Sequence, residues 1–451
     1  MTSPGGSGIA PPAHRGRVEE SPLPARDATR PPGARPHALR RRAGGGHVWL
    51  ALLLCLVSGL VCLLGLEVAA RRALAGSGVD NGQSCAAPGW CGPSRAVREP
   101  HPVLRWENRP LAIEQVPLAE HPDGQFVFRT NAQALRRDTD VAVPKPAGVF
   151  RILVLGDSQT EGYVNNDEHY PHVLETRLRA AGLEHVEVLN AGVGAYEAAY
   201  YYYWYLVHGV SLEPDLVLVG LYLGNDLGDL NPPTAVREDD HGDLVYDWGL
   251  QARHYARLAR GWLLERSWLL GGVADGRLSL ALPGRGPDAR ITPGLRRVLA
   301  DCLGCWYQHF AQGPWTDPRR VEAVQGTYSA LLARLHGQVA RHGSRLVLVP
   351  IPSKAMIEPG DDPAAMAQAR TLLGLTDEEL ASFERTHDIA LAAALAADVP
   401  VADPWLALAT AAQHERLYYR RDWHLTPAGH RALGEFLADT LLHQGLVPPG
   451  S

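Results

Sequence analysis

From residue 149 onward, short runs of apolar residues alternate with longer segments whose pattern is helix-like. Continuous apolar runs are typical of strands that are buried on both faces of a parallel sheet, with helices as the connections between them. The pattern therefore predicts an α/β fold, a three-layer α/β/α sandwich with a parallel sheet, over residues 149–445. The expected strands are Phe150–Leu155, Val186–Leu189, Asp215–Leu223, Leu346–Pro350 and Val399–Ala402, and the expected helices are 168–181, 196–208, 316–342 and 377–397.

Two helix starts and one insertion interrupt this rhythm. Thr376 followed by Glu379 is a capping box, and Thr426 followed by a proline predicts a helix that begins there. Residues 227–315 lack a clear strand rhythm and are interpreted as an insertion. Within it, Tyr255–Leu270 has an amphipathic pattern, which indicates a lid or packing helix, or else a helix that contacts a membrane surface or an acyl chain.

Six consecutive aromatic residues occupy 200–205. They fall on the helix expected at 196–208, so we expect them to pack that helix against the sheet. An aromatic platform for sugars or lipids is the alternative function of this run.

An uncharged apolar run, Val48–Leu66, precedes all of these elements. As a helix, its 19 residues would span about 28 Å, close to the thickness of a bilayer core. We expect residues 47–70 to form a single membrane anchor, with the catalytic domain extracytoplasmic, either periplasmic or extracellular. A cleaved signal peptide that ends near 73–75 is the alternative, although its leader and its apolar core would be unusually long.

The charge of the chain is unevenly distributed. Residues 1–46 contain eight arginines and almost no large apolar side chains, although the whole chain has a net charge of −6. Such a segment cannot bury enough surface to offset its ordering entropy, so we predict a disordered tail. Residues 71–148 are interpreted as a linker and an N-terminal extension with one short strand, Phe126–Arg129. The chain beyond residue 46 is acidic. Because nucleic-acid binding usually needs a basic surface on a folded domain, we expect no nucleic-acid partner.

Four cysteines lie outside the apolar run: Cys85, Cys91, Cys302 and Cys305. In an oxidising compartment they can form two disulfides, with three possible pairings. A four-cysteine zinc site is the alternative, but the spacing of the first pair is loose for zinc. We therefore expect no metal and no cofactor.

Four segments at expected strand ends contain the candidate chemistry. Gly-Asp-Ser158 follows the first strand, where a ligand is expected at the carboxyl edge of an open α/β sheet. The small residues around Gly194 and Ala195 follow the second strand, and Asn225 follows the third. Near the C-terminus, His424 stands just before a capped helix and beside a carboxylate that can orient it, in the segment Arg421-Asp422-Trp423-His424. His430, on that helix, is expected to be a surface residue and not a second base.

In this order, the four segments resemble the four motif blocks of the SGNH (GDSL) hydrolase family, over roughly residues 149–445. The resemblance implies that Ser158 is a nucleophile and that His424 and Asp422 complete a catalytic triad. It also implies an oxyanion hole made by Asn225 and by backbone amides of Ser158 and the second block.

Two positions depart from the family's pattern. The frequent Asp-x-x-His spacing is Asp-x-His in this chain, so Asp422 would have to reach His424 across a bent loop. The expected glycine of the second block aligns with either Gly194 or Ala195, and a backbone N–H could serve from either.

The leading hypothesis is a serine esterase that cleaves acyl or acetyl esters of a small molecule, lipid or carbohydrate through an acyl-enzyme. An O-acyl- or acetyltransferase that acts on envelope polysaccharide is the close alternative, because it shares that intermediate. A catalytically silent carbohydrate-binding scaffold is a third hypothesis. Nucleotide binding would rest on Gly192-x-Gly194 alone, without a third matching glycine.

Overall fold

The computed structural model describes residues 45–74, 85–87, 90–91, 93, 95–228, 230, 236–238, 244–246, 314–361, 363, 366–367, 370–371, 374–420 and 422–448. The expected amphipathic segment Tyr255–Leu270 and the pair Cys302 and Cys305 lie outside these residues. What the sequence predicts for them stays a prediction.

A four-stranded parallel sheet lies at the centre of the described fold. Its strands are β7 (Phe150–Gly156), β8 (Val186–Gly192), β9 (Leu216–Tyr222) and β12 (Arg345–Ile351), in the spatial order β12-β9-β7-β8. Four of the five expected strands are thereby confirmed. The fifth, Val399–Ala402, is reduced to one parallel bridge between Val401 and Leu348, so a strand of full length was wrongly expected there.

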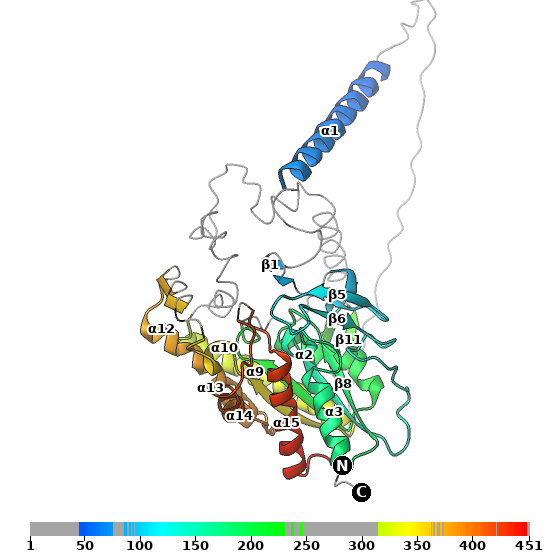
Figure 1. The fold of residues 1–451 in the computed structure, drawn as a ribbon. Helices are drawn as coiled ribbons and strands as arrows, with labels where there is room; N and C mark the ends of the chain where they lie inside the picture. The colour runs from blue at the N-terminus through cyan, green and yellow to red at the C-terminus, as the bar shows by residue number, and fades with distance from the viewer. Residues whose placement is uncertain are drawn as a thin grey trace, which may run out of the picture. The chain divides into compact units, whose positions relative to one another are not determined.

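Side chains alternate between the two faces of the sheet, and each face is covered by helices. Ile152 and Val154 pack with α3 (Tyr170–Ala180) and α15 (Pro427–His443). On the opposite face, buried strand residues pack with the helices α4 (Ala198–Trp204), α9 (Pro318–Arg341) and α13 (Arg385–Ala396). Figure 1 shows α3 and α15 side by side, and α9 beside α13. This arrangement makes three layers, as the sequence predicts.

Local signals place several helix ends correctly. Thr376 and Glu379 form the expected capping box of α12 (Asp377–Ala381), and the Thr426 side chain accepts a hydrogen bond from the Gly429 N–H at the start of α15. The helix expected over 377–397 is divided, because a 3-10 turn at 382–384 separates α12 from α13.

The aromatic run packs where the sequence predicts. The side chains at 201–205 are buried in the core between α4 and the sheet. At Tyr205, the α-helical hydrogen-bonding pattern of α4 gives way to a π-helical turn, Tyr205–Gly209.

The N-terminal extension contains more structure than the one strand expected. A hairpin pairs β3 (Arg98–His101) with β4 (Arg105–Asn108), and a second pairs β5 (Ile113–Pro117) with β6 (Gln125–Arg129). Phe126 and Phe128 are buried in a small apolar cluster of their own. The strand at 126–129 is confirmed, but three neighbouring strands were not predicted.

Further elements are short or lie outside the sheet. The helix α1 (Gly45–Leu74) contains the apolar run, and the described residues include no helix that is long and apolar enough to cross a membrane.

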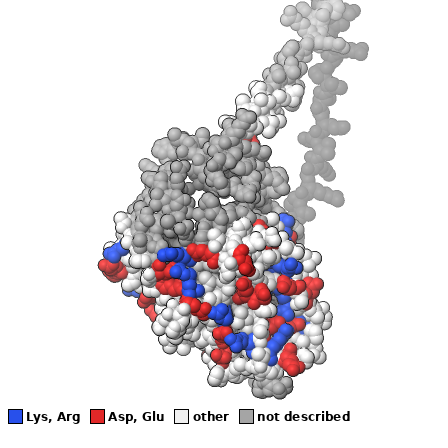
Figure 2. Space-filling model, viewed as in Figure 1, with Lys and Arg blue, Asp and Glu red and all other residues white. Residues whose placement is uncertain are grey.

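Cys85 and Cys91 are Cα partners in the antiparallel pair of β1 (Cys85–Ala87) and β2 (Trp90–Cys91). The remaining elements are β10 (Val236–Glu238), β11 (Leu244–Tyr246), α2 (Ser158–Glu161), α10 (Lys354–Ile357) and α14 (Trp405–Ala411). On the face drawn in Figure 2, acidic and basic side chains are interspersed over the described surface.

Candidate active site

Three of the four candidate segments leave the sheet at one edge. β7 is a central strand, and its last residue, Gly156, is in register with Gly192 of β8 and with Gly220 near the end of β9. In sheets of this order, the carboxyl ends of the central strands, where the connections diverge, form a crevice for ligands. Ser158 follows β7 directly, and Asn225 lies in the turn after β9.

The fourth segment places His424 at the nucleophile candidate. Its Nε2 lies 2.8 Å from Oγ of Ser158, although 266 residues separate the two in the chain. Its Nδ1 is hydrogen-bonded to Oδ1 of Asp422, and all three side chains are buried. When Nδ1–H is donated to the carboxylate, the lone pair of Nε2 faces the serine hydroxyl.

A bent loop compensates for the short Asp-x-His spacing. Oδ1 of Asp422 accepts both the backbone N–H of His424, at 2.8 Å, and the N–H of its ring. Burial alone would raise the pKa of Asp422, but its interaction with His424 outweighs burial and holds that pKa below the usual value. The carboxylate is therefore ionised at neutral pH, as a group that stabilises an imidazolium must be.

Asp157 caps the short helix that begins at Ser158. Its Oδ1 accepts the Gln159 N–H at 2.8 Å, and its Oδ2 lies 3.3 Å from the Ser158 hydroxyl. Burial raises the pKa of Asp157 to about 6. Burial, with Asp157 nearby, also raises the pKa of Asp226 well above its usual value. Asp157 thus supports the turn at Ser158 directly, whereas Asp226 accepts hydrogen bonds from the Tyr222 N–H and the Tyr201 hydroxyl.

The candidate oxyanion donors have free N–H groups. Within the described part of the chain, the backbone N–H groups of Ser158, Gly194 and Ala195 have no hydrogen-bond partner. Ala195 adopts a left-handed conformation, with φ of 61°. The side chain of Asn225 makes no hydrogen bond to any described residue, and its Oδ1 is buried. These groups are thus available to a ligand, and the choice between Gly194 and Ala195 stays open.

The β3–β4 hairpin, which sequence reasoning missed, holds the second segment in place. Trp106 Nε1 donates to the Gly194 carbonyl at 3.2 Å, and Asn108 Nδ2 donates to the Gly192 carbonyl at 3.2 Å. Arg98 makes two hydrogen bonds to the buried carboxylate of Glu161, at 2.5 and 2.7 Å. These partners lie 63 to 88 residues apart, and no local signal in the sequence indicates such pairs.

The same pair lies close to Gly194. A Cβ atom at this position would lie 2.8 Å from Nη2 of Arg98 and 2.9 Å from Oε2 of Glu161. Since real Cβ contacts are longer, a larger residue at this position would require the side-chain ends of the Arg98–Glu161 pair to shift.

His430 corrects a sequence prediction. It was expected on the surface of its helix, but it is fully buried and stacks on Tyr170, with ring centroids 6.0 Å apart. Its Nδ1 accepts the Tyr170 backbone N–H at 3.3 Å. Burial lowers the pKa of His430 to about 3, so its imidazole is neutral and structural.

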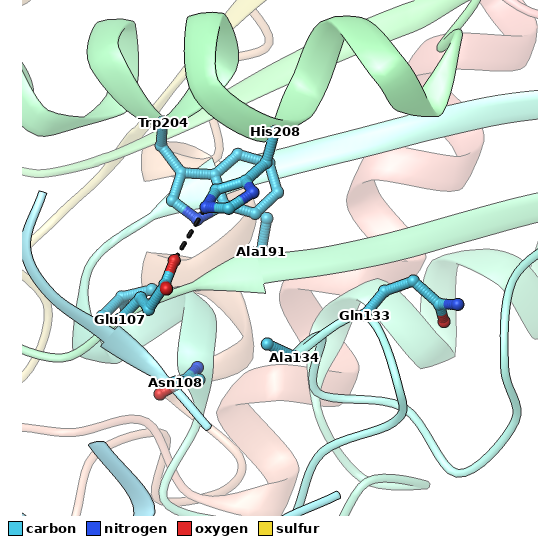
Figure 3. Close-up of a pocket in the computed structure, with 8 residues that line it drawn as sticks. Glu107, Asn108, Gln133, Ala134, Ala191, Trp204 and His208 are labelled. Atoms are coloured by element: carbon cyan, nitrogen blue, oxygen red, sulfur yellow. Dashed lines mark hydrogen bonds and ion pairs between the residues drawn. The ribbon is translucent and has the colours of Figure 1, made fainter. Parts of the chain in front are cut away.

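A small pocket with a cavity volume of about 20 Å³ is lined in part by Ala191 and Trp204, and a second polar cluster lies beside it. Nε2 of His208 lies 2.7 Å from Oε2 of Glu107, and the dashed line in Figure 3 marks this contact. The ligand atoms of His101, Glu107 and His208 lie within 4.8 Å of one another, close enough to hold a metal ion.

The protonation of His101 argues against a metal at this cluster. The backbone N–H groups of Val103 and Leu104 donate to its Nδ1 at 3.2 and 3.1 Å. In a neutral His101 the ring proton therefore lies on Nε2. Because Nδ1 is occupied by the two N–H groups, a metal could bind only Nε2, and it would need that nitrogen without its proton. His208 and Glu107 form a hydrogen-bonded pair, and Nδ1 of His101 accepts backbone N–H groups of its own turn.

Solved structures and one family model match parts of this chain. No curated protein matches the chain. Among solved structures, a lipase/acylhydrolase from Enterococcus faecalis is 13% identical, with 67% of this chain and 100% of that chain covered and a TM-score of 0.36. The acetyl xylan esterase AlAXEase is 12% identical, with 65% and 100% covered and a TM-score of 0.35.

A family model matches the C-terminal part of the chain. The match covers residues 312–449, which include Asp422 and His424. The family is described as an SGNH hydrolase-like domain, acetyltransferase AlgX. This part of the chain is therefore similar to the SGNH hydrolase-like domain of that acetyltransferase family.

Proposed function

We propose that this protein cleaves carboxylic esters through a covalent acyl-enzyme on Ser158. The observation that supports the proposal best is the buried chain of contacts from Ser158 Oγ through His424 to Asp422. A serine hydroxyl becomes an effective nucleophile when a neutral imidazole accepts its proton, and a carboxylate stabilises the imidazolium that results.

The reaction begins when Nε2 of His424 accepts the hydroxyl proton and Oγ of Ser158 attacks the carbonyl carbon of the ester. The tetrahedral intermediate collapses, and the alcohol leaves with the proton that His424 returns to it. A second hydroxyl, from water or from an acceptor alcohol, gives its proton to His424 and attacks the acyl-enzyme. Collapse of this second intermediate returns the proton to Ser158 and releases the acid or a new ester.

The oxyanion of both intermediates needs fixed donors. The backbone N–H groups of Ser158 and of Gly194 or Ala195, with the side-chain amide of Asn225, have no described partner that would compete. The loss of one such donor typically costs about 3–4 kcal/mol of transition-state stabilisation.

An acetyltransferase that acts on carbohydrate hydroxyls is the second candidate. The family match over residues 312–449 supports it, because that family is described by an acetyltransferase. Both functions use the acyl-enzyme and differ only in the acceptor. Acetyl transfer to an oligosaccharide with negligible release of acetate would identify a transferase, and rapid release of acetate without transfer would identify an esterase.

The test of the shared mechanism uses the full-length chain, p-nitrophenyl acetate and a fluorophosphonate probe. Wild type is expected to hydrolyse the ester and to be labelled, and Ser158→Ala is expected to do neither. Ser329→Ala serves as the control, because the Ser329 hydroxyl only donates to a carbonyl within α9. Full activity in Ser158→Ala would refute the nucleophile, and a wild type that is neither active nor labelled would favour a silent carbohydrate-binding scaffold.

We also propose that the N-terminal apolar run anchors the protein to a membrane, with the catalytic part extracytoplasmic. The proposal is supported by the uncharged segment Val48–Leu66 and by the basic residues around it. Fusion of a reporter enzyme to the C-terminus, active only outside the cytoplasm, tests the orientation. Alkaline extraction of membranes distinguishes a retained anchor from a cleaved signal peptide.

A further inference from the structure

We infer that Gln159, the residue after the nucleophile, is the positioning residue that holds His424 against Ser158. The inference rests on the proposed function and assigns a role that the triad itself does not explain. Gln159 is fully buried, and the proposed mechanism uses no atom of its side chain.

Both ends of the Gln159 amide are bonded to the loop that contains His424. Nε2 donates to the backbone carbonyl of Trp423 at 2.9 Å, and Oε1 accepts the backbone N–H of Leu425 at 3.1 Å. These two backbone groups flank His424 on either side. One side chain therefore fixes the main chain before and after the imidazole.

The backbone groups also determine the orientation of this amide. A carbonyl can only accept, and an N–H can only donate, so a flipped amide would lose both bonds. A residue without both a donor and an acceptor at these two positions cannot replace glutamine.

Because Gln159 is next to Ser158 in the chain, its two side-chain bonds connect the loop of His424 to the turn that contains the nucleophile. Its backbone N–H is bonded to the cap residue Asp157, at 2.8 Å, and its neighbour is Ser158. The same short helix that presents the serine hydroxyl therefore sets the distance to the imidazole, although nucleophile and base are 266 residues apart.

Other contacts also hold the segment around His424, including the bonds from Asp422 to its backbone N–H and its ring. The Tyr419 N–H donates to the His424 carbonyl at 3.0 Å, and Tyr418 pairs with Leu425 in an isolated bridge. These contacts close the loop on itself. The Gln159 contacts connect it to the nucleophile turn.

The test compares Gln159→Met and Gln159→Glu with wild type in full-length protein. Methionine has a similar volume and makes neither bond, so we expect kcat to fall roughly 100-fold with KM changed less than about three-fold, since a displacement near 1 Å can cost that much. The rate of fluorophosphonate labelling is expected to fall with kcat.

Gln159→Glu supplies a readout that a purely structural role would not move. An ionised glutamate can accept from Leu425 but repels the Trp423 carbonyl, whereas a protonated one can make both bonds. The kcat of this variant, relative to wild type at the same pH, is therefore expected to rise as pH falls from 8 to 5. The relative kcat of Gln159→Met is expected to stay flat.

Asn131→Leu is the matched control. Its buried amide also bridges main-chain groups, donating to the Thr139 carbonyl and accepting from Gln133 and Leu135, but none of these belongs to the site. It is expected to lower the melting temperature without lowering the kcat of the folded enzyme. A wild-type kcat in Gln159→Met, with Ser158→Ala inactive, would overturn the inference and leave the proposed function standing. Activity in Ser158→Ala would overturn the proposed function itself.

Discussion

Tyr163 lies flat against the imidazole of His424, with ring centroids 3.7 Å apart and ring planes inclined by 17°. Phe126 of β6 stacks on Tyr163 in turn, with centroids 5.8 Å apart. The aromatic face is the negative part of the ring, so in the proposed mechanism it would stabilise the imidazolium that forms when His424 takes the serine proton.

We therefore expect Tyr163→Leu to lower kcat by about two- to five-fold, corresponding to roughly 0.5–1 kcal/mol for a cation–π contact. Tyr163→Phe keeps the stacked ring and is expected to keep kcat. Steady-state ester hydrolysis measures both. An equal loss in the two variants would assign the effect to the hydroxyl group instead of the ring.

Asp422→Asn is expected to lower kcat by about 10³- to 10⁴-fold, because a neutral amide neither fixes the tautomer of His424 nor stabilises its charge. KM should change little, since Asp422 bonds the histidine and makes no contact that substrate would replace. Single-turnover kinetics with p-nitrophenyl acetate would show a slowed acylation step. An unchanged acylation rate would remove Asp422 from the proposed triad.

Trp106→Phe tests the support of the second segment by the hairpin. Phenylalanine keeps the apolar ring but loses the indole N–H that donates to the Gly194 carbonyl. We expect kcat to fall about 10-fold, as for the loss of one hydrogen bond of roughly 1–1.5 kcal/mol. Tyr328→Phe is a control in α9, where the hydroxyl is buried without a described partner. Comparable losses in both variants would indicate general destabilisation.

Two glycines should respond to alanine in opposite directions. A Cβ at Gly192 would lie 2.2 Å from the Glu161 backbone nitrogen, and backbone cannot move aside cheaply. A Cβ at Gly337, within α9, would meet nothing within 4 Å. Thermal unfolding should show a large drop in melting temperature for Gly192→Ala and a gain of about 0.5–1 kcal/mol in stability for Gly337→Ala. A mild effect at Gly192 would mean that α2 can shift away from β8.

The buried Asp157 should make stability depend on pH. Its pKa is raised from 3.8 to about 6, so the folded protein holds this proton more tightly than the unfolded chain. The resulting stabilisation is complete below about pH 4 and is lost as pH rises through 6, on the order of 3 kcal/mol. Asp157→Asn retains a capping oxygen and is expected to flatten this part of the profile.

Denaturant unfolding between pH 4 and 7 measures the effect. The exposed Asp398, already in a left-handed conformation that asparagine tolerates, provides Asp398→Asn as the control. Identical pH slopes for Asp157→Asn and wild type would place the titration elsewhere, with the buried Asp226 as the next group to test.

The sequence is a good guide to this fold where the signal is local. Four apolar runs form the four strands, because a strand buried on both faces needs apolar side chains at every position. Val399–Ala402 is equally apolar but forms only one bridge, to Leu348 of β12. Strand pairing depends on the position of the neighbouring strand, which the apolar pattern does not specify. The hairpin strand Arg98–His101 has charged and polar side chains at three of its four positions, so its pattern resembles a loop.

The same division applies to the site. Ser158 is recognisable because a motif at a strand end marks it, and Asp422 and His424 because a motif just before a capped helix marks them. Gln159 and Trp106 are not, because their partners lie 264 and 88 residues away. His430 was misplaced because its burial depends on the packing of α15 against α3, which a single-helix pattern does not reveal.

The Arg98–Glu161 pair has a practical consequence for any shortened version of this protein. A fragment that starts at residue 149, where the apolar rhythm begins, would omit the guanidinium and leave a buried carboxylate uncompensated. Breaking such a pair typically costs about 3–5 kcal/mol, a large share of a domain's total stability. Shortened or chimaeric versions of the protein should therefore keep residues 95–445 together.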